Sequence, residues 1–140
     1  MRVEGLHHVA LQVRALAPMV AFYRDVFGLP VIAEHLDADG KARSAWMGMP
    51  GGFLALETVR GAPLPTALFR NEAPGWFLVA LRIAPSDRER VRAELGRAKV
   101  LVEHETRWTL YVRDPEGNRV ALSHHPDSAL EPHGPHATGP

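Results

Sequence analysis

Residues 6–13 read Leu6-His7-His8-Val9-Ala10-Leu11-Gln12-Val13, and this alternation of side chains predicts a β-strand. Residues 78–83 read Leu78-Val79-Ala80-Leu81-Arg82-Ile83 and repeat the pattern of residues 8–13 position by position. In both stretches one face is aliphatic and predicts a helix packed against it. The two similar opening strands therefore indicate a duplicated unit.

A helix and three more strands are expected after the first opening strand. The helix should run from Pro18 to Phe27, because proline is tolerated in a first turn and Gly28 is suited to a left-handed C-cap. Strands are expected at residues 29–34, 43–47 and 53–59.

The second half repeats this order. Ser86 and Glu89 form a predicted capping box before a helix that ends near Arg97. Three strands are then expected, at residues 100–103, 108–112 and 119–123. The sequence thus predicts an α+β fold of two tandem βαβββ repeats, forming a cupped mixed sheet with helices on its outer face. An unrelated α+β sandwich with chance similarity is the alternative.

The repeats should occupy about residues 4–59 and 76–125 of a single domain. Residues 60–75 contain three prolines and two glycines and are expected to connect the halves. Residues 126–140 are rich in Pro, Gly, Ala and His without a hydrophobic period, which predicts a disordered tail.

Composition excludes several classes of function. The 140 residues include 16 Lys plus Arg and 16 Asp plus Glu, so no net charge favours nucleic acid or an anionic membrane. Cysteine is absent, which removes disulfides, thiolate metal sites and cysteine nucleophiles. The sequence contains neither a signal peptide nor an apolar run long enough to span a membrane, so we expect a cytoplasmic protein.

Three stretches together resemble a known superfamily. They are residues 6–13, residues 22–29 (Phe22-Tyr23-Arg24-Asp25-Val26-Phe27-Gly28-Leu29) and residues 114–118 (Asp114-Pro115-Glu116-Gly117-Asn118). They resemble the vicinal oxygen chelate superfamily, which includes glyoxalase I, the bleomycin and fosfomycin resistance proteins and the extradiol dioxygenases. The similarity extends from about residue 4 to residue 125. It implies this scaffold, a small-molecule ligand and a homodimer, because single-domain members are commonly dimers.

The same resemblance implies four metal-ligand positions, which fall on His8, Ala55, Leu78 and Ala121. Alanine and leucine offer no oxygen or nitrogen ligand, whereas a catalytic divalent cation needs several. Glu57, two residues beyond Ala55 on the same face, is a weak substitute candidate beside His8. We therefore expect no metal cofactor, and a divalent ion at His8 and Glu57 is the less favoured alternative.

Polar and aromatic side chains on the cup-forming strands are the candidate ligand-binding residues. They are His8, Gln12, Trp46, Arg82, Trp108 and Tyr111. Aromatic rings stack on flat organic molecules, and an arginine can clamp a carboxylate or phosphate with two hydrogen bonds. The alternatives are solvated polar groups and aromatic residues that pack in the core or at a dimer interface.

Two functions follow from these residues. The favoured one is a metal-free protein that binds a small organic molecule in the cup of the sheet, as the drug-sequestering resistance proteins do. The alternative is a lyase, isomerase or ring-cleaving dioxygenase that uses His8, either in a degenerate metal site or as a general base. Catalytic residues are otherwise unknown from the sequence.

Overall fold

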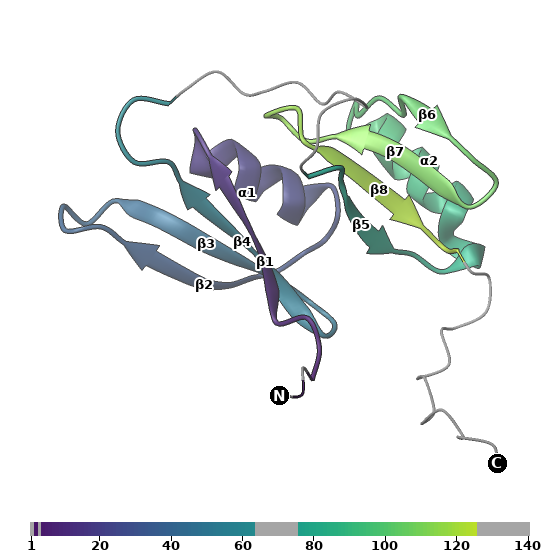
Figure 1. Ribbon diagram of the computed structural model, residues 1–140. Helices are drawn as coiled ribbons and strands as arrows, with labels where there is room; N and C mark the ends of the chain where they lie inside the picture. Colours follow the sequence, from purple (N-terminus) through teal and green to yellow (C-terminus); the bar gives the residue numbers. More distant parts are fainter. Residues whose placement is uncertain (1, 3, 64–75, 126–140) are drawn as a thin grey trace, which may run out of the picture. The chain divides into compact units, whose positions relative to one another are not determined.

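The computed structural model describes residues 2, 4–63 and 76–125, in two compact units (Figure 1). The first unit comprises residues 1–75 and 113–118, and the second comprises residues 76–112 and 119–140. The elements of the first repeat are β1 (His8–Val13), α1 (Leu16–Asp25), β2 (Val31–Leu36), β3 (Ala42–Met49) and β4 (Gly52–Thr58). Those of the second are β5 (Val79–Arg82), the 3₁₀ turn η1 (Pro85–Asp87), α2 (Arg88–Arg97), β6 (His104–Glu105), β7 (Thr109–Arg113) and β8 (Arg119–Ser123). This order is the predicted pair of tandem βαβββ repeats, and among the described residues no helix has the length and apolar character to cross a membrane.

The first sheet has the strand order β1-β4-β3-β2, and α1 packs against β3 and β4. Strands β1 and β4 are parallel, whereas β3 is antiparallel to both β4 and β2. The core between α1 and the sheet consists of fully buried side chains from both elements: Val13, Met19, Tyr23, Ala45, Met47, Leu54 and Leu56. Helical spacing on α1 and alternation on the strands place these residues on facing surfaces, as the sequence predicts.

Strands β1 and β4 approach closely where β4 begins. A Cβ atom at Gly52 would lie 2.8 Å from the carbonyl oxygen of His7, so this position requires glycine. The close approach sets the register in which His8 is paired with Phe53.

The second sheet has the strand order β5-β8-β7-β6, with β5 and β8 parallel. Its buried side chains Leu110, Val112, Val120 and Leu122 alternate with more polar ones along β7 and β8. Leu95 of α2 is likewise buried. The prediction that the two sheets together form one cup stays a prediction.

The turn of residues 114–118 belongs to the first unit, although it joins two strands of the second sheet. The hydroxyl of Tyr23 on α1 donates a hydrogen bond to Asp114 Oδ2 over 3.0 Å. The Glu116 carboxylate accepts hydrogen bonds from the backbone N–H groups of Arg14 (2.7 Å) and Ala15 (3.0 Å). Two stretches that resemble the superfamily are therefore in direct contact, and Glu116 supplies the cap that α1 lacks locally.

This cap accounts for one difference from the sequence prediction. Helix α1 begins at Leu16 rather than at Pro18, and it ends at Asp25 rather than at Phe27. The local sequence offers no capping side chain at Ala15, whereas Glu116, about a hundred residues away, caps the first turn. Gly28 has a φ of +69°, which confirms its predicted left-handed conformation.

The predicted capping box of Ser86 and Glu89 is wrong. Neither the 3₁₀ turn η1 nor α2 has a side-chain cap at its start, because the chain enters α2 through Pro85–Asp87 instead. The strand predicted at residues 100–103 is also wrong in position, since β6 is His104–Glu105. The turn that closes the C-terminal end of α2 takes up the first of these residues, because Val100 N–H donates a hydrogen bond to Leu95 O over 2.9 Å. The predicted tail and most of the predicted connector lie outside the described residues.

Candidate functional site

The face of the first sheet opposite α1 carries its side chains in three rows across the strands. In the register of the sheet these rows are His8–Phe53–Gly48, then Ala10–Ala55–Trp46–Ala33, then Gln12–Glu57–Ser44–His35. Directly paired residues on neighbouring strands lie on the same face of a sheet, so the register alone brings these side chains together.

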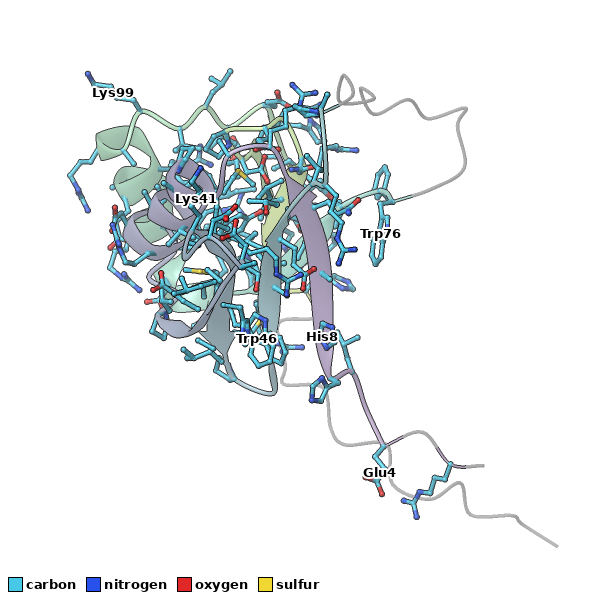
Figure 2. The ribbon with its side chains drawn as sticks, turned by 90° about the vertical axis from the view of Figure 1, so that its left-hand side faces the viewer. Glu4, His8, Lys41, Trp46, Trp76 and Lys99 are labelled. Atoms are coloured by element: carbon cyan, nitrogen blue, oxygen red, sulfur yellow. The ribbon has the colours of Figure 1, made fainter. Side chains whose placement is uncertain are left out.

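Four rings from four different strands form a continuous aromatic row on this face. The rings of His8 and Phe53 are stacked, with centroids 4.8 Å apart and planes inclined by 6°. Phe53 is also stacked on Trp46 at 4.4 Å, and Trp46 meets the edge of His35 at 4.8 Å. Figure 2 shows His8 and Trp46 at the same end of the sheet. Phe53 is covered by a stacked ring on each neighbouring strand, so a flat organic molecule would contact His8, Trp46 and the ring edges of the row rather than a face of Phe53.

A row of polar side chains lies four residues beyond His8 and Phe53 along β1 and β4. Gln12, Glu57, Ser44 and His35 are paired in turn across all four strands. Ser44 is fully buried, at 0% exposure, and its Oγ has no hydrogen-bond partner in the described part of the chain. The same holds for the buried Nε2 atom of His35. Two buried groups able to donate and accept hydrogen bonds thus stand side by side without partners, which is costly unless a ligand group or water satisfies them.

Two small side chains separate His8 and Phe53 from the polar row on β1 and β4. Ala10 and Ala55 are direct partners, and the rows on either side are two residues away along each strand. Two residues of strand span about 7 Å. A ligand lying over these methyl groups can therefore contact both the rings and the polar row.

The face of the second sheet equivalent to this one is polar and basic. Arg82 pairs with Ser123 at the end of β5, and the Ser123 hydroxyl lies 2.8 Å from that of Thr109. The Arg119 guanidinium lies over the rings of Phe77, at 4.6 Å, and Tyr111, at 5.4 Å. Arg82 and Tyr111 of the predicted binding set therefore lie in the second unit, in a basic and aromatic environment.

Trp108 lies apart from Tyr111. It precedes β7, its ring meets the edge of His125 at 4.9 Å, and its carbonyl oxygen accepts a hydrogen bond from the His124 N–H. Alternation puts Trp108 on the side of the buried Leu110. Its role in ligand binding stays a prediction.

The side chains at the implied metal positions do not fit a divalent cation. Ala55 pairs with Ala10, Ala121 pairs with Ala80, and Leu78 immediately precedes β5, so three of the four positions present only hydrocarbon. The fourth, His8, directs Nδ1 at the Nδ1 of His7 over 2.8 Å. Among the described residues no three His, Asp or Glu side chains are grouped as a metal site.

Glu57 does not complete such a site with His8. It pairs with Gln12, four residues along β1 from His8, a separation of about 13 Å along the strand. Side chains standing roughly perpendicular to a sheet at that spacing do not share one ion.

Three residues of this face were missed by the sequence analysis: Phe53, His35 and Ser44. Alternation backwards from Glu57 along β4 would have placed Phe53 on the same face. Alternation from Trp46 along β3 would likewise have placed Ser44 there. His35 could not be placed, because the pairing of β2 with β3 contains register irregularities that no local pattern reveals.

The family model described as Glyoxalase/Bleomycin resistance protein/Dioxygenase superfamily matches residues 5–122. No curated protein sequence matches the chain.

Solved structures share the fold at low sequence identity. The fosfomycin resistance protein FosX of Listeria monocytogenes is 16% identical with a TM-score of 0.69, over 93% of this chain and 95% of that one. A lactoylglutathione lyase of Agrobacterium tumefaciens is 23% identical with a TM-score of 0.62, over 88% and 95%. An integron cassette protein of V. cholerae is 17% identical with a TM-score of 0.64, over 88% and 96%. FosX has also been solved in complex with Mn(II).

Proposed function

Because the chain belongs to the glyoxalase/bleomycin resistance protein/dioxygenase superfamily, we propose that it binds a small, flat organic molecule on the first sheet without a divalent metal. The observation that carries this proposal is the aromatic row of His8, Phe53, Trp46 and His35. Stacking on such rings contributes affinity beyond the burial of apolar area, about 0.5–1.5 kcal/mol for a well-placed pair.

The side chains at the four implied metal-ligand positions support a binding site without metal. FosX binds Mn(II), whereas this chain has alkyl side chains at three of the four positions where the superfamily implies ligands. Binding energy must then come from stacking and hydrogen bonds with the chain's own side chains, so the affinity is expected to be insensitive to chelators.

The test is a calorimetric titration of chelator-treated protein with a panel of flat aromatic compounds. Saturable binding that survives EDTA and is weakened about tenfold or more in Trp46→Ala supports the proposal, since truncating a stacking ring that anchors a ligand costs at least about 1.4 kcal/mol. Trp76→Ala is the matched control, because Trp76 is 80% exposed and belongs to the second unit. Equal loss in both variants, or no binding by any compound, would refute it.

A metalloenzyme remains the alternative that this experiment must exclude, because FosX and the lyase have the same fold. The decisive measurement is metal content after chelation and reloading with Mn, Zn, Ni and Fe(II). One tightly held ion per chain, lost in His8→Ala, would overturn the metal-free reading and favour a lyase, isomerase or dioxygenase that uses His8.

The homodimer and the cytoplasmic location also stay proposals. Single-domain members of the superfamily are commonly dimers, and an open four-stranded sheet has edge strands available for pairing. Light scattering coupled to size exclusion would distinguish a dimer from a monomer directly.

A further inference from the structure

The face of the first sheet opposite α1 carries one negatively charged side chain among its paired positions, Glu57. Glu57 is half-buried and is the only Asp, Glu, Lys or Arg among the paired positions of this face. Beside it on β3 is the fully buried Ser44, whose hydroxyl has no partner in the described chain. A carboxylate next to an unsatisfied hydroxyl favours a ligand group that donates hydrogen bonds and carries positive charge.

Trp46 of the aromatic row lies level with Ala10 and Ala55, one row away from this polar point. Trp46 is paired with Ala55, and Glu57 is two residues further along β4. The spacing of about 7 Å matches a ring with an amino group on a one-carbon arm. Aromatic faces also attract cations, by about 0.5–2 kcal/mol depending on desolvation, so both ends of the surface favour the same ligand charge.

Resting on the proposed function, we infer that the first sheet selects flat aromatic amines in their protonated form. The ring of the ligand packs against Trp46 and the edge of Phe53, whose faces are covered by His8 and Trp46. Its ammonium group donates hydrogen bonds to the Glu57 carboxylate and, once the ligand displaces the side chains that cover it, to Ser44 Oγ. An anionic ligand is disfavoured here, because it would place its charge against Glu57 with no paired arginine or lysine on this face.

Three probes that share one ring and differ only in the polar group test this inference. They are 2-naphthylmethylamine, 2-naphthylmethanol and 2-naphthoate, titrated calorimetrically into metal-free protein at pH 7. We expect the amine to bind most tightly and the carboxylate most weakly. In Glu57→Gln the preference for amine over alcohol should fall by about three- to tenfold, the usual range for a partly desolvated charge contact.

Glu34→Gln is the matched control. Glu34 is on β2 of the same sheet, but it pairs with Ala45 and so lies on the opposite face. This variant makes the same change in net charge and should leave the order and the spacing of the three affinities unchanged. A similar change in both variants would mean that net charge rather than contact sets the preference, and would overturn the inference.

Ser44→Ala is a second test, in which the stability of the free protein and its affinity for the probes should change in different directions. Removing a buried hydroxyl without a partner should leave the melting temperature of the free protein unchanged or higher. The same change should weaken the amine and the alcohol by at least threefold. A lower melting temperature with unchanged affinities would show that Ser44 has a structural role alone.

The outcomes separate this inference from the function on which it rests. If the naphthyl probes bind through Trp46 but 2-naphthoate binds best, the ligand class is wrong and the binding function stands. If no probe binds and none of the aromatic panel binds, the proposed function itself fails.

Discussion

The buried hydrogen bond between Tyr23 and Asp114 is the clearest case in which single residues join distant parts of the sequence. Tyr23 is 1% exposed and Asp114 is 5% exposed, and their side chains are 3.0 Å apart. Asp114 also accepts bonds from the backbone N–H groups of Glu116 and Asn118 and from the Asn118 side chain. One carboxylate therefore shapes the turn and binds it to α1.

Tyr23→Phe should lower the free energy of unfolding by about 1–3 kcal/mol, because it removes a hydrogen bond to a buried charged group. Chemical denaturation followed by circular dichroism measures this. Tyr111→Phe is the control, since it makes the same substitution at the chain's other tyrosine, whose hydroxyl makes no hydrogen bond among the described residues. Equal stability of the two variants would contradict the role given to Tyr23.

The same residue predicts a pH dependence. Burial, the charge of Asp114 and the hydrogen bond to it raise the pKa of Tyr23 well above its usual value of 10.0. Folded protein therefore keeps the proton while the unfolded chain loses it, so stability contributed by Tyr23 is complete below about pH 10 and declines as the pH rises further. Wild-type protein should lose stability between pH 9 and 11 more steeply than Tyr23→Phe, and parallel curves would count against this.

At the scale of elements, the two helices end in left-handed residues of different kinds. After α1 this residue is Gly28, with φ +69°, and after α2 it is Lys99, with φ +58°. Lys99 N–H bonds to Gly96 O and Val100 N–H to Leu95 O, which is the Schellman arrangement that normally has glycine at this point. A side chain in this conformation is strained by roughly 1 kcal/mol.

Lys99→Gly is therefore expected to raise the free energy of unfolding by about 0.5–1 kcal/mol, because it relieves the strain at this position. Part of this gain is offset, since glycine gives the unfolded chain more conformational entropy. Gly28→Ala should lower it by about 1 kcal/mol, because it introduces the strain that Lys99 already has. Thermal unfolding of the two variants compares them directly, and a shift of the same sign in both would contradict the argument. The Lys99 side chain itself extends away from α2 (Figure 2).

At the scale of the whole molecule, the two units are not consecutive in sequence. The chain leaves the first unit after residue 75, returns to it at residues 113–118 and leaves it again. The returning turn caps α1 through Glu116, so folding of the first unit depends on residues synthesised with the second repeat.

Glu116→Ala should lower stability by about 0.5–2 kcal/mol, the usual effect of losing a helix cap. Its specific signature is faster hydrogen exchange at the amides of Arg14 and Ala15, measured by NMR. Glu103→Ala is a control that removes an exposed carboxylate in the second unit. Unchanged exchange at both amides in Glu116→Ala would show that the cap does not form in solution.

The repeated βαβββ order, the two faces of β1 and the left-handed Gly28 could be predicted from the sequence, because alternation, helical spacing and turn residues are local properties. A period of two also gives the face on which His8, Gln12 and Trp46 lie, whereas their part in ligand binding stays a prediction. That Phe53 and His35 complete the aromatic row, and that Ser44 lies buried beside Glu57, depends on how the strands pair and pack in the folded chain. Strand register and the capping of α1 by Glu116 join residues far apart in the chain, and no local pattern encodes which of them become neighbours.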